Sequence, residues 1–196
     1  MNNRFTIFNG TVEITLPESY HPWNEANGSD APNGQKLVQI LETLSADATD
    51  ADRDKTSKSV TTSNDSRFMD DSGAYLFGIT ENRAWEPDKL NEHLDECFQA
   101  IARSLPLVAN AQIATKKLTN ADEQPIGMIR YTFATPHEDW FACTLLLPND
   151  DREALLNCVC PTSHLPAGAL EFNAIADSIR FIVQGDIGDG GVPITK

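Results

Sequence analysis

The amino-acid sequence predicts an α+β fold in which an antiparallel sheet is sandwiched between helices. Two segments carry apolar residues at the spacing of an amphipathic helix, and four strand-like runs follow one another through short polar connections. Short connections favour antiparallel neighbours, since a parallel crossover needs about a dozen residues or more. Each helix must bury its apolar stripe and a sheet offers two faces, so we expect a helix on each face.

The chain is expected to begin with a β-hairpin. Apolar residues alternate along Arg4–Phe8 and Thr11–Leu16, on either side of the dipeptide Asn9-Gly10. Asn-Gly between two such runs is a strong hairpin signal, because both turn residues tolerate a positive φ. Pro17 is expected to end the pairing, since proline has no N–H to donate to a neighbouring strand.

A polar insertion is expected over residues 24–67, where Asn, Ser, Thr, Asp and Gly dominate. Within it, a short helix is predicted over Gln35–Ala46 from the helical spacing of Leu37, Ile40, Leu41 and Leu44. The stretch that follows, Asp47–Ser66, is predicted to be mobile. A long loop without secondary structure in a compact domain is either functional or disordered.

Two elements after the insertion are predicted from local patterns. Ala74–Thr80 combines aromatic and branched residues and is expected to form a strand. Pro87–Leu105 is expected to form a helix, because Pro87 suits a first helical turn and Pro106 stops the pattern. The apolar stripe of this helix comprises Leu90, Leu94, Cys97, Phe98, Ile101 and Leu105.

A meander and a closing helix complete the predicted domain. The four strands of the meander are expected at Ala111–Leu118, Ile126–Ala134, Trp140–Leu147 and Glu153–Cys160. Ala169–Ile182 is predicted to be the second amphipathic helix. A chain of 196 residues with 40% apolar residues can build one core. We therefore predict one domain over residues 1–183 and a flexible, glycine-rich tail at 184–196.

Composition excludes several classes of function. With 15 basic and 29 acidic residues the net charge is −14, so nucleic acids and anionic membranes are not expected partners, whereas a basic protein is. No apolar run approaches the ~20 residues of a membrane span, and the first residues lack the pattern of a secretory segment. We therefore expect a cytoplasmic protein whose four cysteines are reduced and buried.

One metal-binding hypothesis concerns the last predicted strand. Cys158 and Cys160 share a strand face and His164 follows a turn, so the three could bind zinc. Cys143 could join them if the register of the hairpin places it on the same face. The alternative is that the thiols are buried beneath a helix as small apolar groups.

A second enzymatic hypothesis concerns a loop between two strands. His137, Glu138 and Asp139 place a base and two carboxylates together, which is typical of a small hydrolase site and equally of a polar turn. No cofactor is predicted, because glycine-rich phosphate loops do not occur after any predicted strand. The acidic run Asp50–Asp54 lacks the glycine and glutamate that a calcium loop requires.

Two tryptophans are candidate protein-contact residues. Tryptophan is over-represented in binding hot spots, so Trp85 and Trp140 are proposed contacts together with the neighbouring His137 and Glu138. The alternative for each tryptophan is packing in the core.

Three stretches of the chain occur in an order that resembles a known superfamily. They are the hairpin Phe5-x-Ile7 to Val12-x-Ile14-x-Leu16-Pro17, the strands with Ile126-Gly127-x-Ile129-x-Tyr131 and Trp140, and Leu155-Leu156-x-Cys158-x-Cys160 before Ala176-Asp177-Ser178-Ile179-Arg180-Phe181. This order resembles the PsbP-like superfamily, which includes the photosystem protein PsbP, the yeast Ran-binding protein Mog and the bacterial DcrB-like families. The chain departs from DcrB in having no lipoprotein signal, and its loop between Trp23 and Arg67 is longer than expected.

The resemblance implies a PsbP-like α-β-α sandwich that serves as a scaffold for binding proteins and has no shared catalytic centre. Some cytoplasmic bacterial members resemble dedicated chaperones for secreted effector proteins, often as dimers. We therefore expect a non-enzymatic protein-binding domain, acting as a chaperone or adaptor. Its expected partner is a basic protein or a secreted effector, and a homodimer is a candidate assembly.

Overall fold

A computed structural model describes residues 2–23, 61–105, 107–117, 125–135 and 138–182. The predicted helix over Gln35–Ala46 and the predicted tail at 184–196 lie outside these residues, as does most of the predicted mobile stretch.

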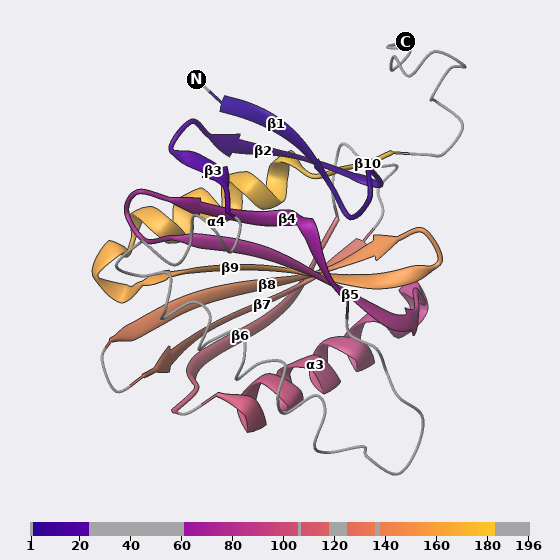
Figure 1. The fold of residues 1–196 in the computed structure, drawn as a ribbon. Coiled ribbons are helices and arrows are strands. Elements are labelled where there is room, and N and C mark those ends of the chain that lie inside the picture. The colour runs from indigo at the N-terminus through magenta and orange to yellow at the C-terminus, as the bar shows by residue number, and fades with distance from the viewer. Residues whose placement is uncertain (1, 24–60, 106, 118–124, 136–137, 183–196) are drawn as a thin grey trace.

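The described strands form two antiparallel sheets (Figure 1). The smaller sheet has the order β1-β2-β10, and the larger sheet has seven strands in the order β3-β4-β5-β9-β8-β7-β6. The strands are β1 (Asn2–Ile7), β2 (Val12–Pro17), β3 (Tyr20–Pro22), β4 (Thr61–Asp70), β5 (Tyr75–Ala84), β6 (Ala109–Lys117), β7 (Pro125–Ala134), β8 (Asp139–Asn149), β9 (Arg152–Pro161) and β10 (Arg180–Phe181).

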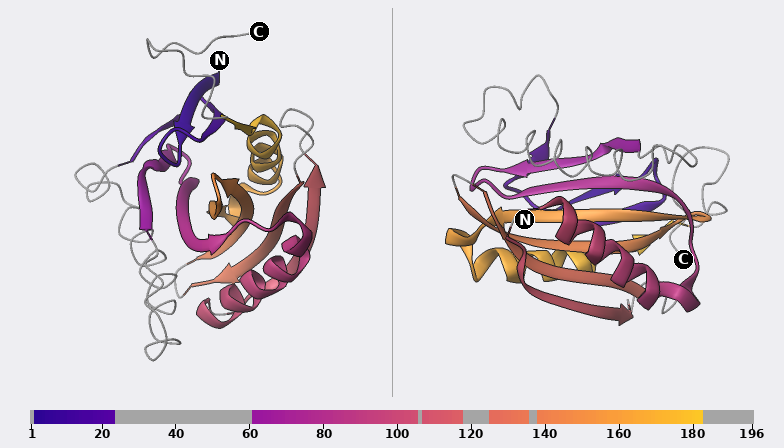
Figure 2. Two further views of the ribbon diagram at one scale, coloured as in Figure 1. Left: turned by 90° about the vertical axis from the view of Figure 1, so that its right-hand side faces the viewer. Right: turned by 90° about the horizontal axis from the view of Figure 1, so that it is seen from below.

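Two helices cover opposite faces of the large sheet, as the sequence predicts (Figure 2). Helix α3 (Leu90–Ser104) follows the short 3-10 helix η1 (Pro87–Lys89) and packs on β7 and β6. Helix α4 (Ala167–Ser178) follows the 3-10 helix η2 (Thr162–His164) and packs against β2 and β8. The α+β fold with helices on both faces is therefore confirmed.

Strand β8, which lies next to the central strand β9, contributes to a core on each face. Phe141, Cys143 and Leu145 belong to the core beneath α4, together with the apolar side of the β1–β2 hairpin. Trp140 and Leu146 belong to the core beneath α3. A strand buried on both faces carries a nearly continuous apolar run, which is what the sequence shows from Trp140 to Leu147.

The first hairpin is confirmed, with a longer turn than Asn9-Gly10 alone. Residues 8–11 connect Ile7 to Val12, and Phe8, Asn9 and Gly10 all have positive φ, at 53°, 58° and 87°. Pro17 is the last residue of β2. The Phe8 side chain is fully buried, which explains why an apolar residue occupies a turn position with a left-handed backbone.

Two stretches differ from the prediction. Thr61–Asp70 forms β4, which pairs with β5, so the end of the predicted insertion is wrong. Its polar composition concealed the strand, because Ser66 is fully buried and its hydroxyl accepts the Phe8 N–H at 3.1 Å.

The closing helix ends earlier than predicted. It stops at Ser178, whose Oγ accepts the Thr15 N–H at 2.9 Å, and residues 180–181 then pair with β2. The apolar pattern continues through Ile179 and Ile182, so periodicity alone does not mark this end.

Candidate functional site

The predicted contact residues do not share one surface in the described chain. Trp140 is only 1% exposed and its ring lies 6.2 Å from Tyr75 and 6.4 Å from Phe133, so it packs in the core. Trp85 is partly buried against the core beneath α3, and its backbone N–H donates to the Asp151 carbonyl at 2.9 Å. Glu138 lies in a turn in which its backbone N–H donates to Thr135 Oγ1 at 3.2 Å, and His137 lies outside the described residues.

The cysteines are free thiols, and three of them are buried. Cys158 and Cys160 lie in the core beneath α4, where a Cβ on Gly168 would come within 2.5 Å of Cys160 Sγ. Cys143 is directly opposite Cys158 in the β8–β9 register, so the two thiols lie on the same face of the sheet, as a shared metal site would require. His164 lies in η2.

Burial keeps these thiols protonated. It raises the pKa of Cys143 to about 11 and that of Cys160 to about 12, and it raises the pKa of Cys158 well above its ordinary value. A thiolate is the form that binds zinc or attacks a substrate. Among the described residues, no three His, Cys, Asp or Glu side chains are grouped so that they could hold a metal ion.

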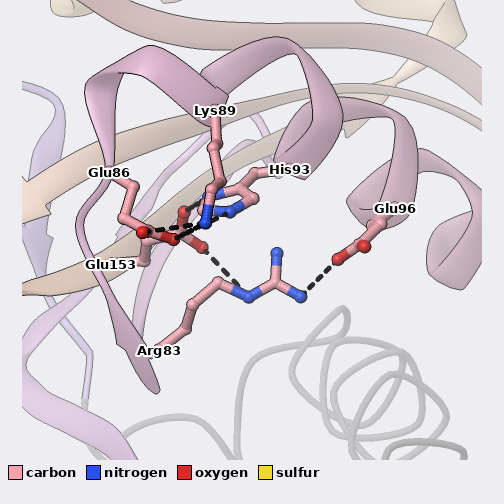
Figure 3. A network of polar contacts seen from close by, with 6 residues as sticks. All are labelled: Arg83, Glu86, Lys89, His93, Glu96 and Glu153. Carbon is pink, nitrogen blue, oxygen red and sulfur yellow. Dashed lines mark hydrogen bonds and ion pairs between the residues drawn. The ribbon is translucent and has the colours of Figure 1, made fainter.

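A polar cluster that the sequence analysis did not predict lies at the start of α3 (Figure 3). We call it the α3 network, and it consists of Arg83, Glu86, Lys89, His93, Glu96 and Glu153. At its centre, His93 Nδ1 and a Glu153 carboxylate oxygen form a hydrogen bond, and both residues are buried. The sequence shows His93 within a predicted helix and Glu153 within a predicted strand, but it does not show that these two polar residues are in contact.

Charges at the rim surround this buried pair. Arg83 Nη2 donates to Glu96 Oε2 at 2.5 Å, and Arg83 Nε lies 3.9 Å from Glu153 Oε2. Lys89 Nζ donates to Glu86 at 2.9 Å. The network thereby joins the end of β5, the start of α3 and the start of β9, and it anchors the helix to the sheet.

Electrostatics in the α3 network do not favour a nucleophile. Burial raises the pKa of the Glu153 carboxyl, and this effect exceeds the opposing influence of His93 and Arg83. Cys97 lies one helical turn after His93, and burial, with the carboxylates of Glu81 and Glu153, raises the pKa of its thiol to about 12. This raised pKa keeps the Cys97 thiol protonated at neutral pH, whereas an activated cysteine needs a lowered pKa.

The raised pKa of Glu153 predicts a pH dependence of stability. An acid whose pKa is higher in the folded than in the unfolded state contributes stability that is complete below the unfolded pKa, about 4.3 for Glu, and is lost as pH rises through the folded pKa. As pH rises towards neutrality, we expect the free energy of unfolding of the native protein to fall relative to that of Glu153→Gln. Urea unfolding of both proteins across this range measures the difference.

The control for this comparison is Glu92→Gln, which removes one exposed carboxylate from α3, at a residue that is not one of the six of the α3 network. Its unfolding free energy is expected to follow that of the native protein with pH. If the unfolding free energy of the native protein stayed constant relative to that of Glu153→Gln, or rose relative to it with pH, the assignment would be contradicted.

An exposed strand forms the second candidate site. β6 is the outermost strand of the large sheet, and among the described residues no strand pairs with its outer edge. Every residue from Ala109 to Thr115 is exposed, and none of them is charged. Ile113 is 40% exposed and lies on the α3 side of the sheet, since its register partner Ile129 belongs to the core beneath α3.

The backbone that leads into β6 is locally strained. Leu107 and Asn110 have φ of 52° and 53°, a region that non-glycine residues seldom adopt, and the β6–β7 register shifts between Ala109 and Gln112. Leu107 is also 79% exposed. This exposed leucine at a strained backbone position lies just before the edge strand β6.

Comparisons with known proteins were made for the whole chain. No family model matches it, and no curated protein matches it. Among solved structures it is similar to LpqN of Mycobacterium tuberculosis, described as involved in cell envelope biogenesis, with 10% identity and a TM-score of 0.44 over 93% of this chain and 91% of that one. None of the described helices is both long and apolar enough to cross a membrane.

Proposed function

We propose that the protein is a non-enzymatic protein-binding domain that pairs an extended segment of a partner protein with the outer edge of β6. The observation that carries this proposal is the exposure of β6 on both faces from Ala109 to Thr115. The chaperone or adaptor role, the PsbP-like membership and the cytoplasmic location predicted from the sequence belong to the same proposal.

Backbone groups at such an edge are suited to strand addition. An outermost strand has N–H and C=O groups that point away from the sheet, and an added strand can satisfy them. Soluble proteins usually protect such edges with charges, proline or very short strands. The opposite edge has this protection, because β3 spans only Tyr20–Pro22 and ends in a proline.

The chemistry of the partner segment follows from the residues that it would meet. Ile113 on the α3 side favours an apolar side chain beside it, and the uncharged stretch Ala109–Thr115 offers no partner for a charge, although β6 ends in Lys116 and Lys117. The net charge of −14 favours a partner protein that is basic outside this segment. The partner is therefore expected to be a basic protein that presents an extended, apolar and uncharged segment.

A charge added at Ile113 on the edge strand is expected to weaken binding. Ile113→Lys places an ammonium beside the position of the added strand, and an edge lysine is a common natural barrier to strand pairing. Proteins captured by the native chain from a lysate of its source cells at low ionic strength should lose about tenfold in recovery with this variant. Quantitative mass spectrometry of the captured proteins makes the comparison.

Leu170→Lys is the matched control, since it places the same charge at a leucine that is 68% exposed on α4 and is not part of the edge strand. It should retain the captured partner. Hydrogen exchange of the β6 amides should then slow when that purified partner is added. Equal recovery with Ile113→Lys, or β6 amides that are not protected in the complex, would overturn the proposal. If the native protein has twice the mass of one chain in solution and Ile113→Lys has the mass of a single chain, the partner is a second copy of this chain.

A further inference from the structure

A groove lies between the small sheet and α4, away from both candidate sites. It has a volume of about 360 Å³ and is lined on one side by Asn2, Arg4, Glu13, Thr15, Pro17 and Arg180. The other side is one face of α4, formed by Glu171, Ala174, Ile175 and Ser178. This volume falls within the range of sites for small ligands.

The charges in this groove are separated along its length. At one end, Arg4 Nη1 lies 3.8 Å from Glu13 Oε1, and Arg180 is opposite Glu13 in the β2–β10 register, so two arginines and one glutamate line this end. Glu171 lies at the other end, where its Oε1 accepts the Tyr20 hydroxyl at 2.5 Å. Glu171 and Ser178 are seven positions apart, which corresponds to about 10 Å along the helix. The groove is therefore positive at one end and negative at the other.

The polar groups in the middle of the groove already have hydrogen-bond partners within the protein. Ser178 Oγ accepts the Thr15 N–H at 2.9 Å and donates to the Ile175 carbonyl at 2.7 Å. Pro17, Ala174 and Ile175 are apolar and offer contact surface without demanding a hydrogen bond. Specific polar recognition is thus left to the two ends.

We infer that this groove binds a short peptide with free ends, with its ammonium at Glu171 and its carboxylate at Arg4 and Arg180. A wholly anionic ligand would meet Glu171 and the acidic protein, and a wholly cationic ligand would meet the two arginines, whereas a zwitterion matches both ends. An extended chain advances about 3.3 Å per residue, so roughly three residues span the distance. This inference is independent of the proposed function of β6.

Trialanine titrated against the labelled protein tests this assignment by NMR. We expect saturable shifts of the Thr15 and Ser178 amides. N-acetylated trialanine and trialanine amide should each bind about tenfold more weakly, since each loses one charge-assisted contact. Failure of trialanine to shift these amides at millimolar concentration, or equal binding of the blocked peptides, would overturn the inference.

Variants assign each end of the groove separately. Glu171→Gln keeps an oxygen for the Tyr20 hydroxyl and should weaken trialanine but not its N-acetylated form. Arg180→Gln should weaken trialanine but not its amide. Asp95→Asn, on the exposed side of α3, is the control for lost charge and should bind like the native protein. Variants that weakened all three peptides equally would show that the ends are not recognised.

Discussion

The Leu94→Asp variant is expected not to fold. Leu94 is fully buried, and its Cδ2 lies within 2.6 Å of the position that a Cβ on Gly127 would take, so α3 and β7 are in direct contact there. An unpaired carboxylate at this point costs about 4 kcal/mol or more, because no lysine or arginine is buried among the described residues to pair with it. This is a large part of the roughly 5–15 kcal/mol that stabilises a domain.

The measurement is the yield of folded protein together with near-UV circular dichroism and urea unfolding. Leu170→Asp is the matched control, since it makes the same change at a leucine that is 68% exposed on the other helix. That variant should unfold with the cooperativity of the native protein. A folded, cooperatively unfolding Leu94→Asp protein would mean that α3 is not required for the core on its face.

The Gly78→Val variant is expected to lose about 3 kcal/mol of stability. A Cβ at this position would lie 2.5 Å from Ser66 Cβ and 2.6 Å from a ring carbon of Phe8. Neither neighbour can move freely, because Phe8 is fully buried in the turn of the first hairpin and Ser66 lies within β4. Valine favours strands, so the expected loss reports on packing and not on strand propensity.

Urea unfolding measures this loss, and hydrogen exchange should show that the amides of β1 and β2 become less protected than those of β8. Gly78→Ala and Phe8→Ala, alone and combined, form a double-mutant cycle. The combined variant should be more stable than the sum of the single effects predicts, since removing the ring makes room for the methyl group. Additive losses would show that Phe8 does not restrict this position.

Some elements were predictable because one local signal dominated. The α3 helix had a proline at its start and a single apolar stripe, and the four meander strands were separated by short polar connections. β4 was missed because Ser66 is buried through a hydrogen bond with Phe8, which is 58 residues away and therefore invisible to a local pattern. The end of α4 was predicted too late because Ile179, just after the helix, is buried and apolar. Such a residue continues the apolar pattern of the helix although it is no longer part of it.

The candidate sites were less accessible to sequence reasoning. Trp85 and Trp140 were predicted as contact residues from their residue type alone, which does not show whether a side chain is buried. Trp140 is in fact buried in the core. The α3 network depends on the pairing of His93 with Glu153, which are 60 residues apart. The β6 edge depends on strand order, which a sequence of antiparallel strands does not determine by itself.

The pairing of β10 with β2 joins the last described strand to the first hairpin, and this has a consequence for synthesis. The Ile182 N–H donates to the Thr11 carbonyl at 2.8 Å, so the second strand gains this neighbour only after nearly the whole domain has left the ribosome. Until then, Val12, Ile14 and Leu16 have neither β10 nor α4 to cover them. The apolar side chains of β2 therefore stay uncovered during synthesis until β10 and α4 have been made.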